Sequence, residues 1–248
     1  MRKILFAFFT ISLLIFSLPA DLQAEEEPAP RQVIIYMIDK LDLKDLNPEV
    51  TPELWALQNK AGLGLLNTLS AGERTSKNVL CTISAGKLAI GSSNADLNFK
   101  ASEIIQGEKA GEMFFRNTGL LPADHNIVTN SIEVIRKNNE NRGLGKPGQL
   151  GDELHALGLK TAVIGNADLP GYYSRPGALI LMDSRGIVDN GLTGKKVLEK
   201  SSPLPLSSNY QTILHAYRDF SDYDVVLIDF GDLARLDRLQ SLLSHQQL

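Results

Sequence analysis

Two short segments carry side chains that could act together on a phosphate group. The first, VIIYMID at residues 33 to 39, is an apolar run that stops on the carboxylate of Asp39. The second, RTSKNVLCTISAG at residues 74 to 86, brings the hydroxyls of Thr75 and Ser76. A hydroxyl attacks phosphorus poorly at neutral pH, and a divalent cation lowers the pKa of that hydroxyl and orients it. The pattern therefore predicts a sheet edge where an acid and two hydroxyls begin a metal-assisted phosphoryl-transfer site.

Each of these residues has a chemical role in this hypothesis and an ordinary structural alternative. Asp39 would bind or bridge the metal, and Ser76 or Thr75 would be the nucleophile. Asn78 would donate a hydrogen bond to a phosphoryl oxygen. The alternative for the two hydroxyls is helix capping, because hydroxyls that precede a helix commonly accept hydrogen bonds from its free backbone amides. Both interpretations stay open at the level of sequence.

Further acidic residues follow other predicted strands, at the position where parallel sheets gather their ligands. They are Asp168, Asp183, Asp229 and Asp232. Carboxylate oxygens suit hard divalent cations, so Asp229 and Asp232 are candidate metal ligands beside Asp39. The structural alternative for any one acid is a turn or a helix cap. A working site would bind Mn²⁺, Mg²⁺ or Zn²⁺, and the metal would raise the melting temperature.

The elements that must position these side chains alternate between apolar strands and helices. Continuous apolar runs predict strands covered on both faces, at 33–38, 161–168, 178–183 and 225–230. Helical patterns lie at 51–62, 101–119, 147–158 and 210–219, with Thr51 as an N-cap and Gly62 and Gly158 as stops. A strand leading into a helix is predicted at 126–142. The alternation predicts an α/β domain with a largely parallel sheet and helices on both faces.

Composition and the first residues indicate an exported protein of one main domain. The 248 residues carry a net charge of −4, which argues against a dedicated nucleic-acid binder. Residues 1–24 have the basic start, apolar stretch and small residues of an export signal, followed by an acidic linker at 25–31 and the domain at 32–248. Cleavage is favoured because the apolar stretch is short, and retention as a membrane anchor is the alternative. The lone Cys81 leaves no internal disulfide.

The order of these motifs resembles the alkaline phosphatase superfamily, including the cofactor-independent phosphoglycerate mutases. Three segments also resemble a group of uncharacterised bacterial envelope proteins related to it: GEMFFRNTG at 111–119, KPGQLGDELHALGLKTAVIGNAD at 146–168 and LILMDSRGIVD at 179–189. The resemblance implies an alkaline-phosphatase-like α/β fold, a metal ligand at Asp39 and a nucleophile at Ser76 or Thr75. It is carried by VIIYMID, by a TPxLxxL helix through Thr51, Pro52, Leu54 and Leu57, by Ser76 before ISAG at 83–86, and by VVLIDFGDLARLD.

The departures from that superfamily limit what the resemblance implies. Its late strand usually supplies an Asp with a His four residues on, whereas Asp232 is followed by Leu236. Further ligands would come after Leu248, so the resemblance implies a domain that is incomplete at the C-terminus, with VVLIDF as an exposed edge strand. The predicted function is an exported, metal-dependent phosphatase- or phosphotransferase-like hydrolase acting on a small-molecule or envelope phosphate ester. The alternatives are a catalytically inactive envelope binding protein and a non-functional fragment of a longer enzyme.

Overall fold

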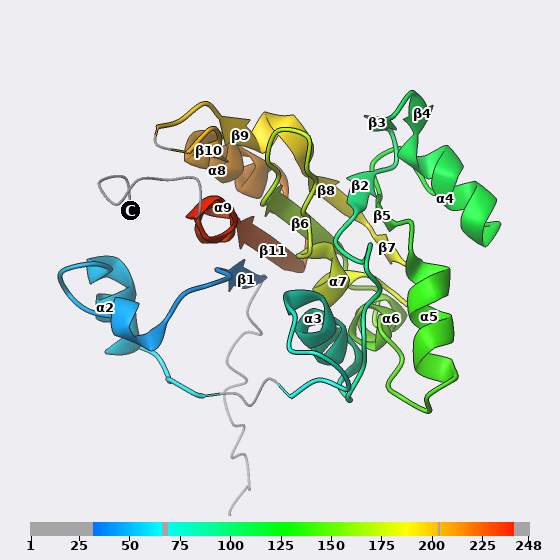
Figure 1. Ribbon diagram of the computed structural model, residues 1–248, viewed down its shortest axis with the longest axis horizontal. Coiled ribbons are helices and arrows are strands. Elements are labelled where there is room, and N and C mark those ends of the chain that lie inside the picture. Colours follow the sequence, from blue (N-terminus) through cyan, green and yellow to red (C-terminus); the bar gives the residue numbers. More distant parts are fainter. Residues whose placement is uncertain (1–31, 66–68, 203, 241–248) are drawn as a thin grey trace, which may run out of the picture. The chain divides into compact units, whose positions relative to one another are not determined.

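The computed structural model describes residues 32–65, 69–202 and 204–240 (Figure 1). The predicted export signal at 1–24 and linker at 25–31 lie outside the described residues. The described chain contains a four-stranded parallel sheet flanked by helices. The predicted mixed α/β class is therefore confirmed.

The parallel sheet has the strand order β1-β11-β6-β8. Its members are β1 (Val33–Met37), β11 (Val225–Phe230), β6 (Thr161–Asn166) and β8 (Asn190–Leu192). Met37 pairs with Asp229, and Asp229 pairs with Gly165, so the strands end at nearly the same level. Smaller antiparallel sheets contain β2 (Asn98–Lys100), β5 (Ile127–Thr129) and β7 (Ile187–Val188), then β3 (Ile104–Ile105) with β4 (Glu108–Lys109), and β9 (Leu198–Glu199) with β10 (Ser207–Ser208).

Helices connect the strands, as the alternating pattern predicts. The longer ones are α2 (Pro52–Gln58), α3 (Ser76–Ala85), α4 (Ala110–Thr118), α5 (Ile132–Glu140), α6 (Gln149–Ala156), α8 (Tyr210–Asp219) and α9 (Asp232–Leu239). The short ones are η1 (Leu43–Asp45), α7 (Ala178–Leu181) and η2 (Gly194–Val197). Among the described helices, none has both the length and the apolar character needed to cross a bilayer.

Side chains of the sheet alternate between two apolar clusters, one on each face. Val163 and Leu227 point into a cluster that they share with α3 and α7. Their neighbours Ile164 and Ile228 point to the opposite face, where Ile213 of α8 covers them. Because successive strand residues face opposite sides, the central positions of β6 and β11 need apolar residues on both faces. This explains the consecutive apolar residues AVI in β6 and VVLI in β11, and it confirms helices on both faces of the sheet.

Two predictions about strand position are wrong. The run at β1 predicts a strand covered on both faces, but β1 lies at an edge of the described sheet, and 48% of Val33 and 59% of Tyr36 are exposed. Conversely, the predicted exposed edge VVLIDF is β11, which lies between β1 and β6. Composition reports how apolar a strand is, and it does not identify the neighbours that pair with it.

Three local predictions also differ from the structure. The first four residues of the apolar run 178–183 form the buried helix α7, because a six-residue run is too short for its period to separate a strand from a buried helix. The stretch 101–119 is helical only from Ala110, after a β3–β4 hairpin whose turn places Gln106 and Gly107 at positive φ. Helix α2 ends at Gln58, before Gly62, and the hydroxyl of its N-cap residue Thr51 bonds the carbonyl of Asp45 instead of capping the helix.

The close approach of β6 to β11 gives a test of the sheet. Gly165 has φ +97°, and a Cβ there would overlap the backbone oxygen of Asp229. We expect Gly165→Ala to lower the free energy of unfolding by about 3 kcal/mol or more, through strain and overpacking together. Gly158→Ala is the matched control: φ is +75° but the space is open, so about 1 kcal/mol is expected. Equal losses in urea denaturation would contradict the tight strand contact.

Candidate functional site

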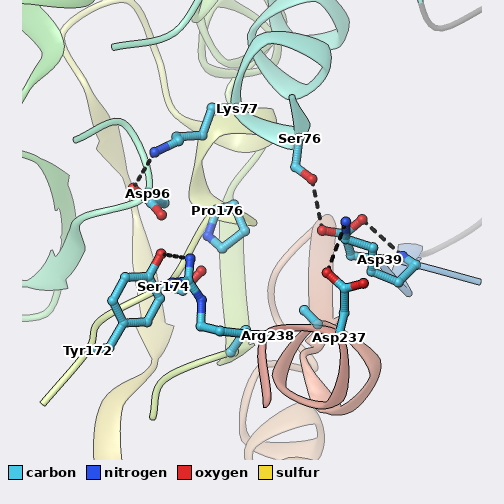
Figure 2. Close-up of a pocket in the computed structure, with 12 residues that line it drawn as sticks. Asp39, Ser76, Lys77, Asp96, Tyr172, Ser174, Pro176, Asp237 and Arg238 are labelled. Atoms are coloured by element: carbon cyan, nitrogen blue, oxygen red, sulfur yellow. Dashed lines mark hydrogen bonds and ion pairs between the residues drawn. The ribbon is translucent and has the colours of Figure 1, made fainter. Parts of the chain in front are cut away.

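A hydrogen bond joins the end of β1 to the start of α3. The Ser76 hydroxyl donates to Asp39 Oδ2 at 2.8 Å, and Figure 2 shows the two side chains pointing toward each other. Asp39 lies two residues past the end of β1, and its other oxygen accepts from the backbone N–H of Lys40 at 2.9 Å. Lys40 adopts φ +68°, which turns the chain sharply after the strand. The structure therefore brings together the acid and one of the two hydroxyls that the sequence singles out.

The three hydroxyl and amide candidates have different surroundings. Ser76 is the first residue of α3, where free backbone N–H groups give a partial positive charge. Thr75 is the N-cap, and its Oγ1 accepts from the backbone N–H of Asn78 at 3.3 Å. The Asn78 amide bonds backbone atoms at both ends, donating to the Glu73 carbonyl and accepting from Gly91. Ser76 is thus the candidate hydroxyl that reaches Asp39, while Thr75 and Asn78 shape the start of the helix.

A cavity of about 420 Å³ opens beside this pair. It is lined by three basic and three acidic side chains: Lys40, Lys77 and Arg238, and Asp39, Asp96 and Asp237. Lys77 lies 3.3 Å from Asp96 and Lys40 lies 3.2 Å from Asp237, so four of the charges are paired. The guanidinium of Arg238 stacks 3.7 Å from the centre of the Tyr172 ring. The cavity therefore has cations in the same lining as Ser76 without a large net charge.

A buried ion cluster supports the far wall of this cavity. Residues 167–176 contribute several lining side chains, Tyr172 among them. Arg175 within that loop is buried and donates to Asp168 at 2.7 Å and to Glu103 at 2.6 Å. Two buried or half-buried carboxylates thus hold one guanidinium, and charge-assisted bonds of this kind are the stronger ones in proteins. Asp168, predicted to follow a strand as a ligand candidate, instead anchors this loop.

Asp229 is a buried carboxyl group close to Asp39. It is 2% exposed, it accepts a backbone hydrogen bond from Gly177, and its Oδ2 has no partner among the described residues. Burial raises the pKa of Asp229 to about 7, and the negative charge of Asp39 adds to the rise. The structure therefore places Asp229 near the Ser76–Asp39 pair, as an acid that is costly to ionise.

Asp232 is engaged elsewhere. Its Oδ1 accepts from Arg235 at 2.8 Å and from the Ser208 N–H at 2.9 Å, and its Oδ2 accepts from the Tyr210 hydroxyl at 2.8 Å. Burial alone would raise the pKa of Asp232, but the hydrogen bonds from Arg235 and its neighbours outweigh burial and lower it. Asp232 is not among the described residues that line the cavity. Its position next to Arg235 suits an ion pair better than a metal ligand.

The donor set does not fit a two-cation centre. Within residues 32–240, as far as the structure describes them, no group of three or more His, Cys, Asp or Glu side chains comes together to hold a metal. Asp39 and Ser76 supply adjacent oxygens, and Asp232 is held by Arg235. Closed metal sites in proteins use about three or four ligands. The chemistry below is therefore derived from the chain's own residues.

Several lining residues were missed by the sequence reasoning. Lys77 directly follows Ser76, and its position in RTSKN could have indicated a cation beside the hydroxyl. Ala234, Asp237 and Arg238 are spaced three and four residues apart, so they share one face of α9. Tyr172 has no comparable signal, because the fold of the 167–176 loop brings it to the cavity.

Comparison with known proteins finds no similar protein. The chain matches no protein-family model, no curated protein and no solved structure. The resemblance to the alkaline phosphatase superfamily thus stays a prediction from the motifs.

Asp229 gives a test of the electrostatics at this site. Because its folded pKa of about 7 lies above the ordinary aspartate value of 3.8, the folded state binds an extra proton between these values. Stability supplied by that proton is lost as the pH rises from about 4 to 7. In Asp229→Asn the loss is absent, so the variant gains stability relative to the wild type by up to about 1.4 kcal/mol per pH unit.

Urea denaturation at several pH values between 4 and 8 measures this difference. Asp237→Asn is the control, since Asp237 is half exposed and pairs with Lys40 at the surface. Its effect should stay within about 1 kcal/mol at each pH. Parallel pH profiles for the wild type and Asp229→Asn would contradict the assignment.

Proposed function

We propose that this chain is a phosphatase- or phosphotransferase-like hydrolase that acts on a phosphate ester through Ser76. The observation that carries the proposal is the 2.8 Å hydrogen bond from the Ser76 hydroxyl to Asp39, at a helix N-terminus that borders a cavity. A nucleophile bonded to a base is the usual sign of an activated hydroxyl. The same helix terminus attracts anions such as phosphate.

The proposed reaction needs one bond to form and one to break. The Ser76 oxygen bonds to phosphorus while the bond between phosphorus and the ester oxygen breaks. The serine proton passes to Asp39, which already accepts it in a hydrogen bond. The released alkoxide takes a proton from solvent. Water or a second alcohol then attacks the phosphoserine, and the bond between phosphorus and the Ser76 oxygen breaks. Asp39 returns its proton to Ser76, and the attacking oxygen releases its proton to solvent.

Cations around the cavity would hold the phosphoryl oxygens during this reaction. Lys77 follows Ser76 on α3, and Arg238 approaches from α9, so the two come from different sides of the cavity. Both carry hydrogen-bond donors that suit phosphate, and Arg does so with a planar fork. Ground-state ion pairing of Lys77 with Asp96 would weaken as phosphate approaches. Binding and positioning are thus assigned to groups other than the nucleophile.

The finer features of the proposal rest on the sequence resemblance. They are an alkaline-phosphatase-like architecture that is incomplete at its C-terminus, an extracytoplasmic location, and a substrate among small-molecule or envelope phosphate esters. Metal dependence also rests on the resemblance. A bound divalent cation would neutralise charge on the phosphoryl group. Asp39 is the described residue best placed to hold it, with Asp229 as a neighbour.

A second candidate is an envelope protein that binds a phosphate-bearing ligand without turnover. The observation that favours it is the donor set, since the described residues do not assemble three metal-ligating side chains. The two ion pairs in the cavity would also suit an anionic ligand that replaces a carboxylate as the partner of a lysine and later dissociates unchanged.

Release of p-nitrophenol from p-nitrophenyl phosphate and its diester separates these candidates. We expect Ser76→Ala to reduce turnover to background, and Asp39→Asn to reduce it by about 10² or more through loss of the proton acceptor. Thr75→Ala should cost about 1 kcal/mol of stability through the lost cap while the folded protein still turns over. Ser221→Ala, an exposed serine after α8, is the matched control. Binding without turnover in the wild type would favour the second candidate.

Thermal melting with Mn²⁺, Mg²⁺ or Zn²⁺ tests the metal. A site with two donor side chains binds weakly, and a ligand near its Kd stabilises by only about 0.4 kcal/mol. We therefore expect the melting temperature to rise by about 1 to 2 °C at most. A larger rise that disappears in Asp39→Ala would show that further residues complete a cation site around Asp39.

A further inference from the structure

A second cavity adjoins the Ser76–Asp39 pair. It has a volume of about 310 Å³, and Asp39, Ser76 and Pro176 line both this cavity and the larger one. The reactive pair therefore borders two spaces of different character. We call the second one the apolar groove, after the residues described next.

The apolar groove is built from the end of β1 and the first turns of α3. Its apolar side chains are Met37, Ile38, Val79 and Leu80, together with the shared Pro176. Leu80 is 7% exposed and fixed in the core, while Ile38 and Val79 are partly buried. Arg74 is the one basic residue among the described lining. The groove thus differs from the first cavity, which has six charged side chains.

We propose that the substrate is a phosphate ester of an apolar alcohol, with its phosphoryl group in the charged cavity and its alkyl or aryl part in the apolar groove. This inference rests on the proposed function, because it needs phosphorus at Ser76. Both spaces meet at Ser76. One molecule can therefore fill both only if it carries phosphoryl oxygens on one side of its phosphorus and an apolar group on the other. An amphiphilic phosphate ester has this arrangement.

Physical chemistry favours an apolar alcohol over a sugar or nucleoside. Apolar surface gains about 25 cal/mol for each Å² removed from water, and the groove offers four aliphatic or thioether side chains for that contact. A sugar would lose the hydration of its hydroxyls against the same side chains, which is costly when no hydrogen bond replaces it. Arg74 at the groove adds attraction for an anionic ligand.

Binding of two phosphonates tests the groove without any need for turnover. Methylphosphonate and n-octylphosphonate share a head group, and their carbon–phosphorus bonds resist ester hydrolysis. Titration calorimetry on the full chain should give at least about tenfold tighter binding of n-octylphosphonate, since each buried methylene adds affinity. Equal affinities would overturn the inference, even if p-nitrophenyl phosphate is hydrolysed.

Matched threonine substitutions locate the effect. Ile38→Thr and Val79→Thr place a hydroxyl in the groove, and each should weaken n-octylphosphonate by about fivefold while methylphosphonate is unchanged. Ile83→Thr makes the same replacement on α3 at an exposed position outside the described lining, and it should alter neither affinity. Melting curves confirm folding of each variant. A preference for the octyl chain that survives both groove variants would overturn the inference.

The outcomes separate this inference from the proposed function. Tight n-octylphosphonate binding without hydrolysis of n-octyl phosphate supports the groove and counts against the hydrolase. Absence of binding by both phosphonates removes the phosphate site and overturns both. Sedimentation with phosphatidylcholine vesicles, with and without phosphatidate, identifies the source of the ester. Phosphatidate-dependent sedimentation supports a membrane lipid, and n-octylphosphonate binding alone supports a soluble ester.

Discussion

The register of the parallel sheet is the constraint on which the candidate site depends. Met37, Asp229 and Gly165 lie in one row across β1, β11 and β6, so the segments that follow these strands leave the sheet at the same level. Asp39 then meets Ser76 only because α3 packs on the face that carries Leu227. A slip of one residue in β1 would turn every side chain of that strand to the other face. The apolar contacts of the sheet thus fix the position of a polar pair at its edge.

Three acids near this edge, two buried and one half-buried, have different partners. Asp232 pairs with the buried guanidinium of Arg235, and its pKa falls below the ordinary value. Asp168 pairs with Arg175, yet burial outweighs that guanidinium and raises its pKa. Asp229 has no such partner among the described residues, and burial together with Asp39 raises its pKa to about 7. The buried acid without a cationic partner is therefore one whose charge is repelled by Asp39, and a proton or an added cation would relieve that repulsion.

The sequence predicts helices, strands and the Asp39–Ser76 contact better than it predicts which strands pair with one another in the sheet. The strands at β6 and β11 and the helix after Thr75 follow from apolar runs and capping residues, and the Asp39–Ser76 meeting follows from where they end. The edge position of β1 could not be predicted, because a strand's partners are set by distant segments. The ion pair of Asp232 could not be predicted for a related reason: Arg235 lies one helix turn away, but only the fold buries it against Ser208 and the Asn166 carbonyl.

The edge position of β1 also links the two spaces around Ser76. Met37 and Ile38 line the apolar groove, Lys40 lines the charged cavity, and Asp39 between them lines both, so these four consecutive residues divide between the two spaces. This division occurs where the strand ends and Lys40 turns the chain at φ +68°, since regular alternation of faces stops there. Among the described strands, β1 pairs with β11 alone. A ligand that fills both spaces would therefore bridge β1 and α3, and its apolar part would stabilise the same segment that presents Asp39 to the hydroxyl.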